Sequence, residues 1–219
     1  MKEFNTHKVI EINHSKSGVF ELILERNELH FDPGDCVAIY SDKEKSRPYS
    51  ISSGIYDNLI SFLIRKIPSG DVSEYLSKLK KNQEVKISKP FGWFKPIKCL
   101  KNEKNIFLAT GTGLAPFLSY LKSYPSEPPH ALFYGVRRKD DLHGLKNLKN
   151  IKILSISISQ EDSKFHRGRI TDLLSSLPIS KNNNYYCCGR ESMINDVRFF
   201  LKEKGIQNNK IFNEVFFNG

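Results

Sequence analysis

The pattern of hydrophobic and polar residues changes near residue 100 of this 219-residue chain. Before that point, short apolar runs are separated by turn residues, which is typical of β-strands. After it, apolar runs alternate with stretches of helical spacing. We therefore expect two domains, residues 1–98 and residues 99–219.

The first half is predicted to be mostly β-structure. An Asp-Pro-Gly-Asp turn at residues 32–35 precedes one of the runs, and a single helix is predicted at residues 72–80. Many short strands at turn spacing favour a small antiparallel barrel. The predicted strands are residues 19–24, 36–40, 59–64 and 84–87.

The second half alternates strands with helices, which predicts a parallel sheet with right-handed crossovers. Ligands of such sheets bind beyond the carboxyl ends of the strands. Dinucleotide-binding folds often carry an acidic ribose ligand about 20 positions after a glycine-rich turn. About 20 positions after Gly111 and Gly113, this chain has Phe133 and Tyr134 instead. The predicted strands are residues 106–109, 131–134, 151–158 and 185–188, and the predicted helices are residues 115–124, 170–177 and 192–204.

The first strand of this half leads into Thr110-Gly111-Thr112-Gly113, and another apolar run follows. Glycines permit a tight turn, and free N–H groups at the start of a helix suit a phosphate. The match to a G-x-G-x-x-G fingerprint is partial, because Pro116 takes the place of the third glycine. An ordinary strand-to-helix turn is the alternative. Further polar residues follow the other strands: Gly135 and Arg137, Ser159 and Gln160, and Cys188, Gly189 and Arg190.

Two stretches of the first half carry groups suited to a nucleotide. The first, residues 47–53, contains Arg47, whose fork suits phosphate, Tyr49, whose ring can stack, and Ser50, a hydroxyl. The second, residues 68–73, opens the predicted helix and offers a second anion site. The alternatives are a strand aromatic for Tyr49 and a simple helix N-cap for Ser73.

The chain is basic, with 34 Lys and Arg against 24 Asp and Glu and a formal charge of +10. Such a surface can favour nucleic acid, an anionic membrane or an acidic protein partner. No block of five like charges occurs, so we expect no nucleic-acid binding. An abundance of Lys, Asn and Ile could also reflect genomic composition.

The cysteines, residues 36, 99, 187 and 188, form no C-x-x-C pair, and the histidines show no metal spacing. We expect no bound metal and reduced thiols. No signal core and no run of about 18 apolar residues occurs. We therefore expect a cytoplasmic protein that does not enter a membrane.

Taken in order, R-x-Y-S, G-x-V-S, P-F-G and T-G-T-G-x-A-P-F resemble the ferredoxin–NADP reductase superfamily, from about Arg47 to Phe217. The resemblance implies an N-terminal antiparallel FAD-binding β-barrel and a Rossmann-like parallel α/β nucleotide-binding domain. One departure is Lys89 before Pro90-Phe91-Gly92, where many relatives have glycine.

For FAD, the resemblance implies that Arg47 meets the diphosphate, Tyr49 packs on the isoalloxazine and Ser50 lies beside N5. Residues 63–65 would follow the adenosine side, and Gly70, Val72 and Ser73 would hold the diphosphate through backbone N–H groups and the Ser73 hydroxyl. The implied FAD residues are Arg47, Pro48, Tyr49, Ser50, Leu63, Ile64, Arg65, Gly70, Asp71, Val72 and Ser73.

For NAD(P)H, residues 111–116 would bind the pyrophosphate and Cys188 would place a thiol near the nicotinamide. Phe216 would cover the flavin. Cys188 could instead be a buried strand cysteine, and Phe216 a core residue of a final edge strand. The implied nucleotide residues are Thr110, Gly111, Thr112, Gly113, Pro116, Gly135, Arg137, Ser159, Gln160, Cys188, Gly189 and Phe216; the implied catalytic residues are Ser50, Cys188, Glu214 and Phe216.

The resemblance implies an FAD-dependent oxidoreductase that moves electrons between NAD(P)H and an acidic ferredoxin or flavodoxin on a separate chain. We expect a monomer. Reduction of an oxygenase system, or of free flavin or quinone, is the alternative, and a flavin-binding module without turnover is a rival of another class. Gln160 favours NADH or dual use, although Lys164, Arg167 and Arg169 could supply charge for a 2′-phosphate.

Overall fold

The protein is described by a computed structural model that covers residues 4–96 and 102–216. The chain divides into two compact units. The first comprises the residues up to Lys95 together with residues 115–123, and the second comprises residues 96–114 and 124–218. The boundary expected between residues 98 and 99 lies outside the described residues and stays a prediction.

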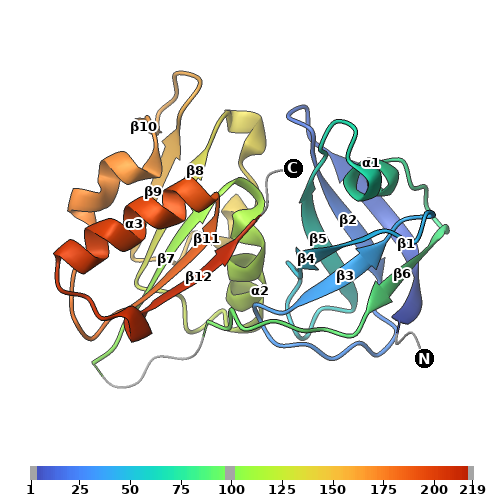
Figure 1. Ribbon diagram of the computed structural model, residues 1–219, viewed down its shortest axis with the longest axis horizontal. Coiled ribbons are helices and arrows are strands. Elements are labelled where there is room, and N and C mark those ends of the chain that lie inside the picture. Colours follow the sequence, from blue (N-terminus) through green and yellow to red (C-terminus); the bar gives the residue numbers. More distant parts are fainter. Residues whose placement is uncertain (1–3, 97–101, 217–219) are drawn as a thin grey trace. The chain divides into compact units, whose positions relative to one another are not determined.

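The first unit is a six-stranded antiparallel barrel (Figure 1). The strand order is β4-β3-β6-β1-β2-β5. A bridge between Ile51, which follows β4, and Phe62 in β5 joins the first and last strands of this order, so that the barrel is nearly closed. The strands are β1 (Phe4–His14), β2 (Val19–Glu25), β3 (Cys36–Tyr40), β4 (Ser46–Ser50), β5 (Leu59–Arg65) and β6 (Glu84–Ser88), and one helix, α1 (Asp71–Ser77), follows β5.

Alternating side chains fill the barrel. In β2, Phe20, Leu22 and Leu24 are fully buried, while the residues between them are partly exposed. Pro48 is accommodated because it stands in β4, an edge strand of the sheet order, where a missing donor costs little. The barrel core therefore forms from the strand pattern that the sequence predicts.

Helix α2 (Ala115–Ser123) belongs to the barrel unit although it follows the glycine turn in the chain. The N–H of Ile55 donates to Ser123 Oγ at 3.0 Å, and the rings of Phe94 and Phe117 meet edge to face at 5.6 Å. A Cβ on Gly54 would lie 2.9 Å from Lys122 Cβ, so glycine permits this close approach.

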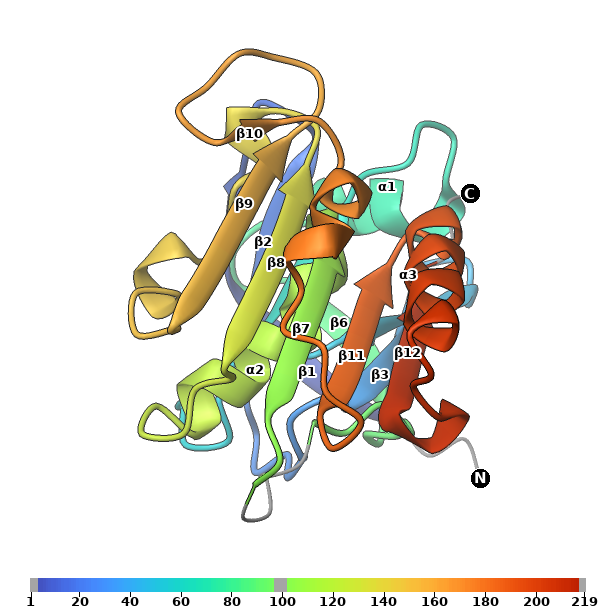
Figure 2. The same cartoon turned by 90° about the vertical axis from the view of Figure 1, so that its left-hand side faces the viewer.

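The second unit is a six-stranded parallel sheet of order β10-β9-β8-β7-β11-β12. Helix α3 (Glu191–Glu203) lies along one face of it (Figure 2). Met193, Ile194 and Val197 of this helix pack in the same core cluster as Ile106 and Leu108. The strands are β7 (Asn105–Thr110), β8 (Ala131–Val136), β9 (Ile153–Ile158), β10 (His166–Arg167), β11 (Asn184–Gly189) and β12 (Ile211–Val215).

Short 3-10 helices replace part of the predicted α-helix content. The helix predicted at residues 170–177 is the 3-10 helix η4 (Ile170–Ser176), because Pro178 disfavours α-conformation at Leu177 and polar residues compete for backbone hydrogen bonds. The connection between β8 and β9 carries only η2 (Lys139–Asp141) and η3 (Leu145–Asn147). The remaining 3-10 helices are η1 (Gly111–Leu114) and η5 (Asn208–Lys210).

Candidate active site

The glycine turn, residues 110–113, is formed by the last residue of β7 and the 3-10 helix η1, and α2 begins directly after η1. Gly111 has a φ of +56°, and a Cβ built on it would meet nothing within 4 Å. Gly113 is packed differently, because its Cβ would lie 2.4 Å from the carbonyl oxygen of Cys188. Gly111 thus leaves the backbone open to a ligand, whereas Gly113 lets the turn pack against β11.

Cys188 and Glu214 meet at the ends of two neighbouring strands. Parallel pairing places them side by side, and the Sγ of Cys188 donates to Oε2 of Glu214 at 3.8 Å. Cys188 is fully buried. Burial, and then the Glu214 carboxylate, raises the pKa of the Cys188 thiol well above its ordinary value. This thiol therefore packs and donates a hydrogen bond while staying protonated.

Gly189 joins this pair to the glycine turn. It has a φ of +134°, and its Cβ would lie 2.1 Å from Thr110 Oγ1. The same hydroxyl accepts from the N–H of Arg190 at 3.0 Å, and the N–H of Phe216 donates to the Gly189 carbonyl at 2.9 Å. Six residues predicted from the sequence are thereby gathered at the carboxyl ends of β7, β11 and β12: Thr110, Gly113, Cys188, Gly189, Glu214 and Phe216.

The neighbouring strand ends carry the rest of the predicted nucleotide residues. The N–H of Ser159 donates to the Val136 carbonyl at 3.1 Å, and that of Gln160 to the Arg137 carbonyl at 2.9 Å. The side chains of Arg137, Ser159 and Gln160 are exposed. Packing explains the glycine at position 135, because a Cβ added there would lie 2.2 Å from Ile170 Cγ2.

The loop after β9 presents basic groups beside these residues. Arg167 pairs with Asp162 at 2.8 Å, and the backbone N–H of Arg169 donates to Asp172 at 2.8 Å. The guanidinium of Arg169 has no ion-pair partner among the described residues. Asp172 was not predicted from the sequence, although it arranges this loop.

In the barrel, β4 carries the R-x-Y-S motif. Arg47 and Pro48 are exposed, Tyr49 is half-buried against the barrel core, and Ser50 is buried. Burial raises the pKa of Tyr49 to about 12, against a smaller lowering by Arg47. Tyr49 therefore packs as a strand aromatic, and stacking of its outer face on a flavin stays a prediction.

The loop before α1 is fixed by Ser73, whose hydroxyl accepts from the N–H of Ile67 at 3.0 Å. Gly70 is the N-cap residue and has no side chain to cap the helix, so the interpretation of Ser73 as the N-cap is wrong. Along β5, Leu63 and Ile64 are buried, and Arg65 donates to the Ser17 carbonyl at 3.3 Å. Any contact of residues 63–65 and 70–73 with FAD is therefore made by groups that are exposed and not by the side chains buried in the barrel core.

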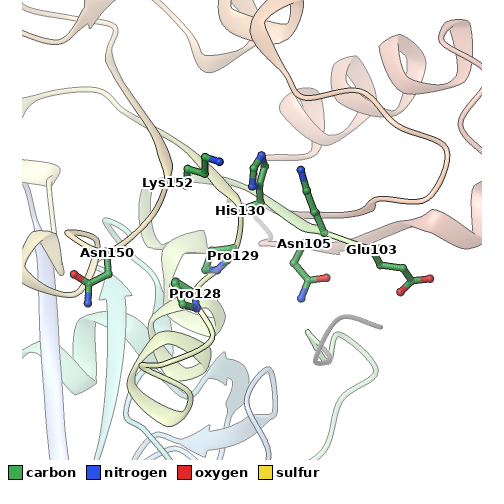
Figure 3. Close-up of a pocket in the computed structure, with 8 residues that line it drawn as sticks. Glu103, Asn105, Pro128, Pro129, His130, Asn150 and Lys152 are labelled. Atoms are coloured by element: carbon green, nitrogen blue, oxygen red, sulfur yellow. The ribbon is translucent and has the colours of Figure 1, made fainter. Parts of the chain in front are cut away.

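A separate hollow of about 260 Å³ lies at the amino ends of the parallel strands (Figure 3). Lys104, His130 and Lys152 line it, and each directly precedes a strand: β7, β8 and β9 respectively. Burial, followed by the charges of Lys104 and Lys152, lowers the pKa of His130. The predicted nucleotide residues lie at the opposite ends of these strands.

Two family models match the chain in succession. The first, described as an oxidoreductase FAD-binding domain, matches residues 5–95, and the second, an oxidoreductase NAD-binding domain, matches residues 107–198. The chain thus combines an oxidoreductase FAD-binding domain with an oxidoreductase NAD-binding domain. The chain belongs to the ferredoxin–NADP reductase superfamily.

The curated relatives include oxygenase electron transfer components and ferredoxin–NADP reductases. The toluate 1,2-dioxygenase electron transfer component of Pseudomonas putida is 31% identical over 87% of this chain and 60% of its own length. The ferredoxin–NADP reductase of Azotobacter vinelandii is 26% identical over 90% of this chain and 88% of its own length. The chain spans 60–64% of the length of the first four curated relatives it matches.

The crystal structure of a ferredoxin NADP+ reductase from Neisseria gonorrhoeae with bound FAD and NADP has a TM-score of 0.86 at 20% identity, over 99% of this chain and all of that one. This likeness shows the fold. Within the described residues, no helix has the length and apolar character needed to cross a membrane.

The residues present fit both cofactors. Gly111 leaves open space beside the backbone of the glycine turn, as the approach of a pyrophosphate requires. On the barrel, an exposed Arg47 next to a half-buried Tyr49 offers a charged fork and an aromatic face, which suit a diphosphate and a flavin ring.

Proposed function

We propose that this protein is a ferredoxin–NAD(P) reductase that moves electrons between NAD(P)H and a separate one-electron carrier protein. The observation that supports it best is the cluster at the carboxyl ends of β7, β11 and β12, where Cys188 contacts Glu214 beside the glycine turn. Similarity to ferredoxin–NADP reductases along 88–92% of their own length also supports the proposal.

On the barrel, Arg47 together with Gly70, Val72 and Ser73 would hold the FAD diphosphate, and Tyr49 would pack on the isoalloxazine ring. Bound FAD supplies the chemistry, since it can take a hydride and release single electrons. Ser50 provides a hydroxyl beside N5. The protein contributes binding, orientation and electrostatics to this reaction.

At the sheet, the backbone of residues 111–113 receives the NAD(P)H pyrophosphate. Cys188 and Glu214 then position the nicotinamide by packing and hydrogen bonding, because the protonated thiol is no nucleophile. Holding two reacting atoms in line is worth several kcal/mol of barrier, about 7–11 in the best intramolecular cases.

We propose that the enzyme uses NADH or both nucleotides. Gln160 offers neutral dipoles where an Arg would grip a 2′-phosphate, and Arg167 is already paired with Asp162. Arg169 retains an unpaired guanidinium within the described part of the loop. A kcat/KM ratio that favours NADPH by more than about tenfold, ~1.4 kcal/mol, would show that Arg169 compensates for Gln160.

The carrier is proposed to be an acidic ferredoxin or flavodoxin, because the basic excess of the chain complements it. That excess is uneven: residues 96–219 hold 19 Lys and Arg against 11 Asp and Glu, whereas residues 1–95 hold 15 against 13. The second candidate is the reductase of an oxygenase system, favoured by the 31% identity to dioxygenase electron transfer components.

We further propose that the protein works as a cytoplasmic monomer. Cys36, Cys187 and Cys188 are free thiols, which suits a reducing compartment. Gel filtration of the holoprotein should give a mass near 25.2 kDa.

Turnover measurements test the function. NADH oxidation by the purified protein should reduce ferricyanide, and adding an acidic ferredoxin or a flavodoxin should support reduction of cytochrome c. Comparison with a ferredoxin of an oxygenase system separates the two candidates. Retention of flavin without nucleotide-driven turnover would leave only the binding module.

A further inference from the structure

An ion pair stands at the predicted diphosphate site of the barrel. Nζ of Lys45, in the β3–β4 hairpin, lies 2.5 Å from Oδ2 of Asp71, the first residue of α1. Asp71 follows Gly70 inside the G-x-V-S motif, and Lys45 lies two residues before Arg47. The pair therefore joins the two segments that we propose to hold the FAD diphosphate.

The surrounding charges converge on Asp71. Its pKa is lowered chiefly by the hydrogen bond and charge of Lys45, and further by Lys43 and Arg47. All three cations come from the β3–β4 hairpin: Lys43 and Lys45 from its turn, and Arg47 from β4. The positive charge at this site thus comes from side chains, and α1, with seven residues, is too short to supply an anion site by itself.

A carboxylate at this place opposes the binding of an anionic ligand. A diphosphate held by Arg47, Gly70, Val72 and Ser73 would lie near Asp71, and two like charges repel each other. The pair is exposed, with side-chain exposures of 56% for Lys45 and 42% for Asp71, so it adds little to folding stability.

We propose that Lys45 is a positioning residue that neutralises Asp71 and so allows the barrel to retain FAD. This inference rests on the proposed FAD site. Lys45 acts through Asp71: with the lysine present the carboxylate is paired, and without it the carboxylate repels the diphosphate. Asp71 is thus an element that limits FAD affinity rather than a ligand of the cofactor.

The experiment measures FAD release from purified holoprotein, followed by the rise of flavin fluorescence after dilution. Lys45→Met should release FAD about three- to tenfold faster than wild type. Asp71→Asn should release it no faster than wild type, and the double variant should return to the wild-type rate. Since the effect is Coulombic, 1 M KCl should largely remove the Lys45→Met difference.

Two controls accompany these variants. Lys78→Met breaks an exposed i,i+4 ion pair with Glu74 on the same helix and should leave FAD release unchanged. Arg47→Met tests the site itself and should release FAD faster in any case. If Arg47→Met has no effect, the proposed FAD site is misplaced. If only Arg47→Met accelerates release, the site stands and the role of Lys45 is overturned.

If the Lys45–Asp71 ion pair only holds the two segments together, the variants give a different pattern of FAD release rates. Lys45→Met and Asp71→Asn would then be equally fast, with no recovery in the double variant and little effect of salt. Either of these results would overturn the neutralising role. Thermal unfolding of each holoprotein shows that the variants fold, so that a release rate reports on FAD and not on unfolded protein.

Discussion

At the scale of single residues, the surroundings of Cys188 determine what its side chain does. The thiol is enclosed by β11, its neighbours and the Glu214 carboxylate, and both burial and charge oppose its ionisation. The sequence offered a buried strand cysteine as one of two interpretations of Cys188, but it did not indicate the contact with Glu214. The context of Cys188, Cys-Gly after an apolar run, did indicate that the residue lies near the end of a strand.

Cys188 is expected to act as a hydrogen-bond donor. Cys188→Ala removes the donor to Glu214 and should slow flavin reduction by NADH by roughly three- to tenfold, whereas Cys188→Ser keeps a donor and should be closer to wild type. Because the pKa of Cys188 is raised, wild-type reduction should show no thiol ionisation between about pH 6 and 9. Stopped-flow measurements across this range are the check. An ionisation step that disappears in Cys188→Ser would contradict the assignment.

Phe216 is the residue at which two interpretations still differ. It is half-buried and bonded through its N–H to Gly189, directly after β12. If its ring covers the flavin, Phe216→Ser should bind NAD+ more tightly and show a flavin–nicotinamide charge-transfer band, because no ring needs to be displaced. Titration by absorbance measures both. Unchanged affinity without a band would identify Phe216 as a packing residue of the last strand.

At the scale of elements, the two glycines of the turn have separable roles. Gly113→Ala forces a Cβ to 2.4 Å from the Cys188 carbonyl and should destabilise the fold by about 1–3 kcal/mol, as overpacking does. Gly111→Ala meets no atom but needs a left-handed residue, at a cost of about 1–2 kcal/mol, and should also weaken nucleotide binding. Urea unfolding and NAD+ titration of both variants test the difference. Equal loss of nucleotide binding at equal stability would show that the roles are not separable.

The amino ends of the same strands give a pH prediction. His130 has a lowered pKa in the folded state, so the unfolded chain binds its proton first as the pH falls. The contribution of His130 to stability is therefore complete above about pH 6.5 and declines as the pH falls towards its folded pKa. Lys152→Met should raise the pKa of His130, as measured by NMR titration of its ring. A pKa that stays the same would show that Lys152 does not act on it.

Most strands could be predicted because their apolar runs are continuous or alternate cleanly. The strand at residues 36–40 was predicted with the bounds of β3. By contrast, β1 was missed because polar residues occupy most of its length and only Val9 and His7 are buried. The 3-10 helix η4 was predicted as α, since periodicity over seven residues does not separate the two geometries.

At the scale of the whole molecule, the sequence predicted an antiparallel barrel and a parallel α/β domain, with an ordered set of motifs in each. The sites inside each unit depend on parallel and antiparallel register, which joins residues far apart in the chain. Cys188 meets Glu214 and Thr110 meets Gly189 because three parallel strands end at one edge. The Lys45–Asp71 pair and the role of Asp172 could not be predicted, because each depends on how a loop folds back.

The most direct test of the central claim is anaerobic reduction of the purified protein, with its bound flavin identified after release. We predict stoichiometric FAD, bleaching of the flavin absorbance by NADH, and reoxidation by an acidic ferredoxin or flavodoxin. A protein that carries FMN or no flavin would contradict the account, and so would bound FAD that neither nicotinamide nucleotide reduces.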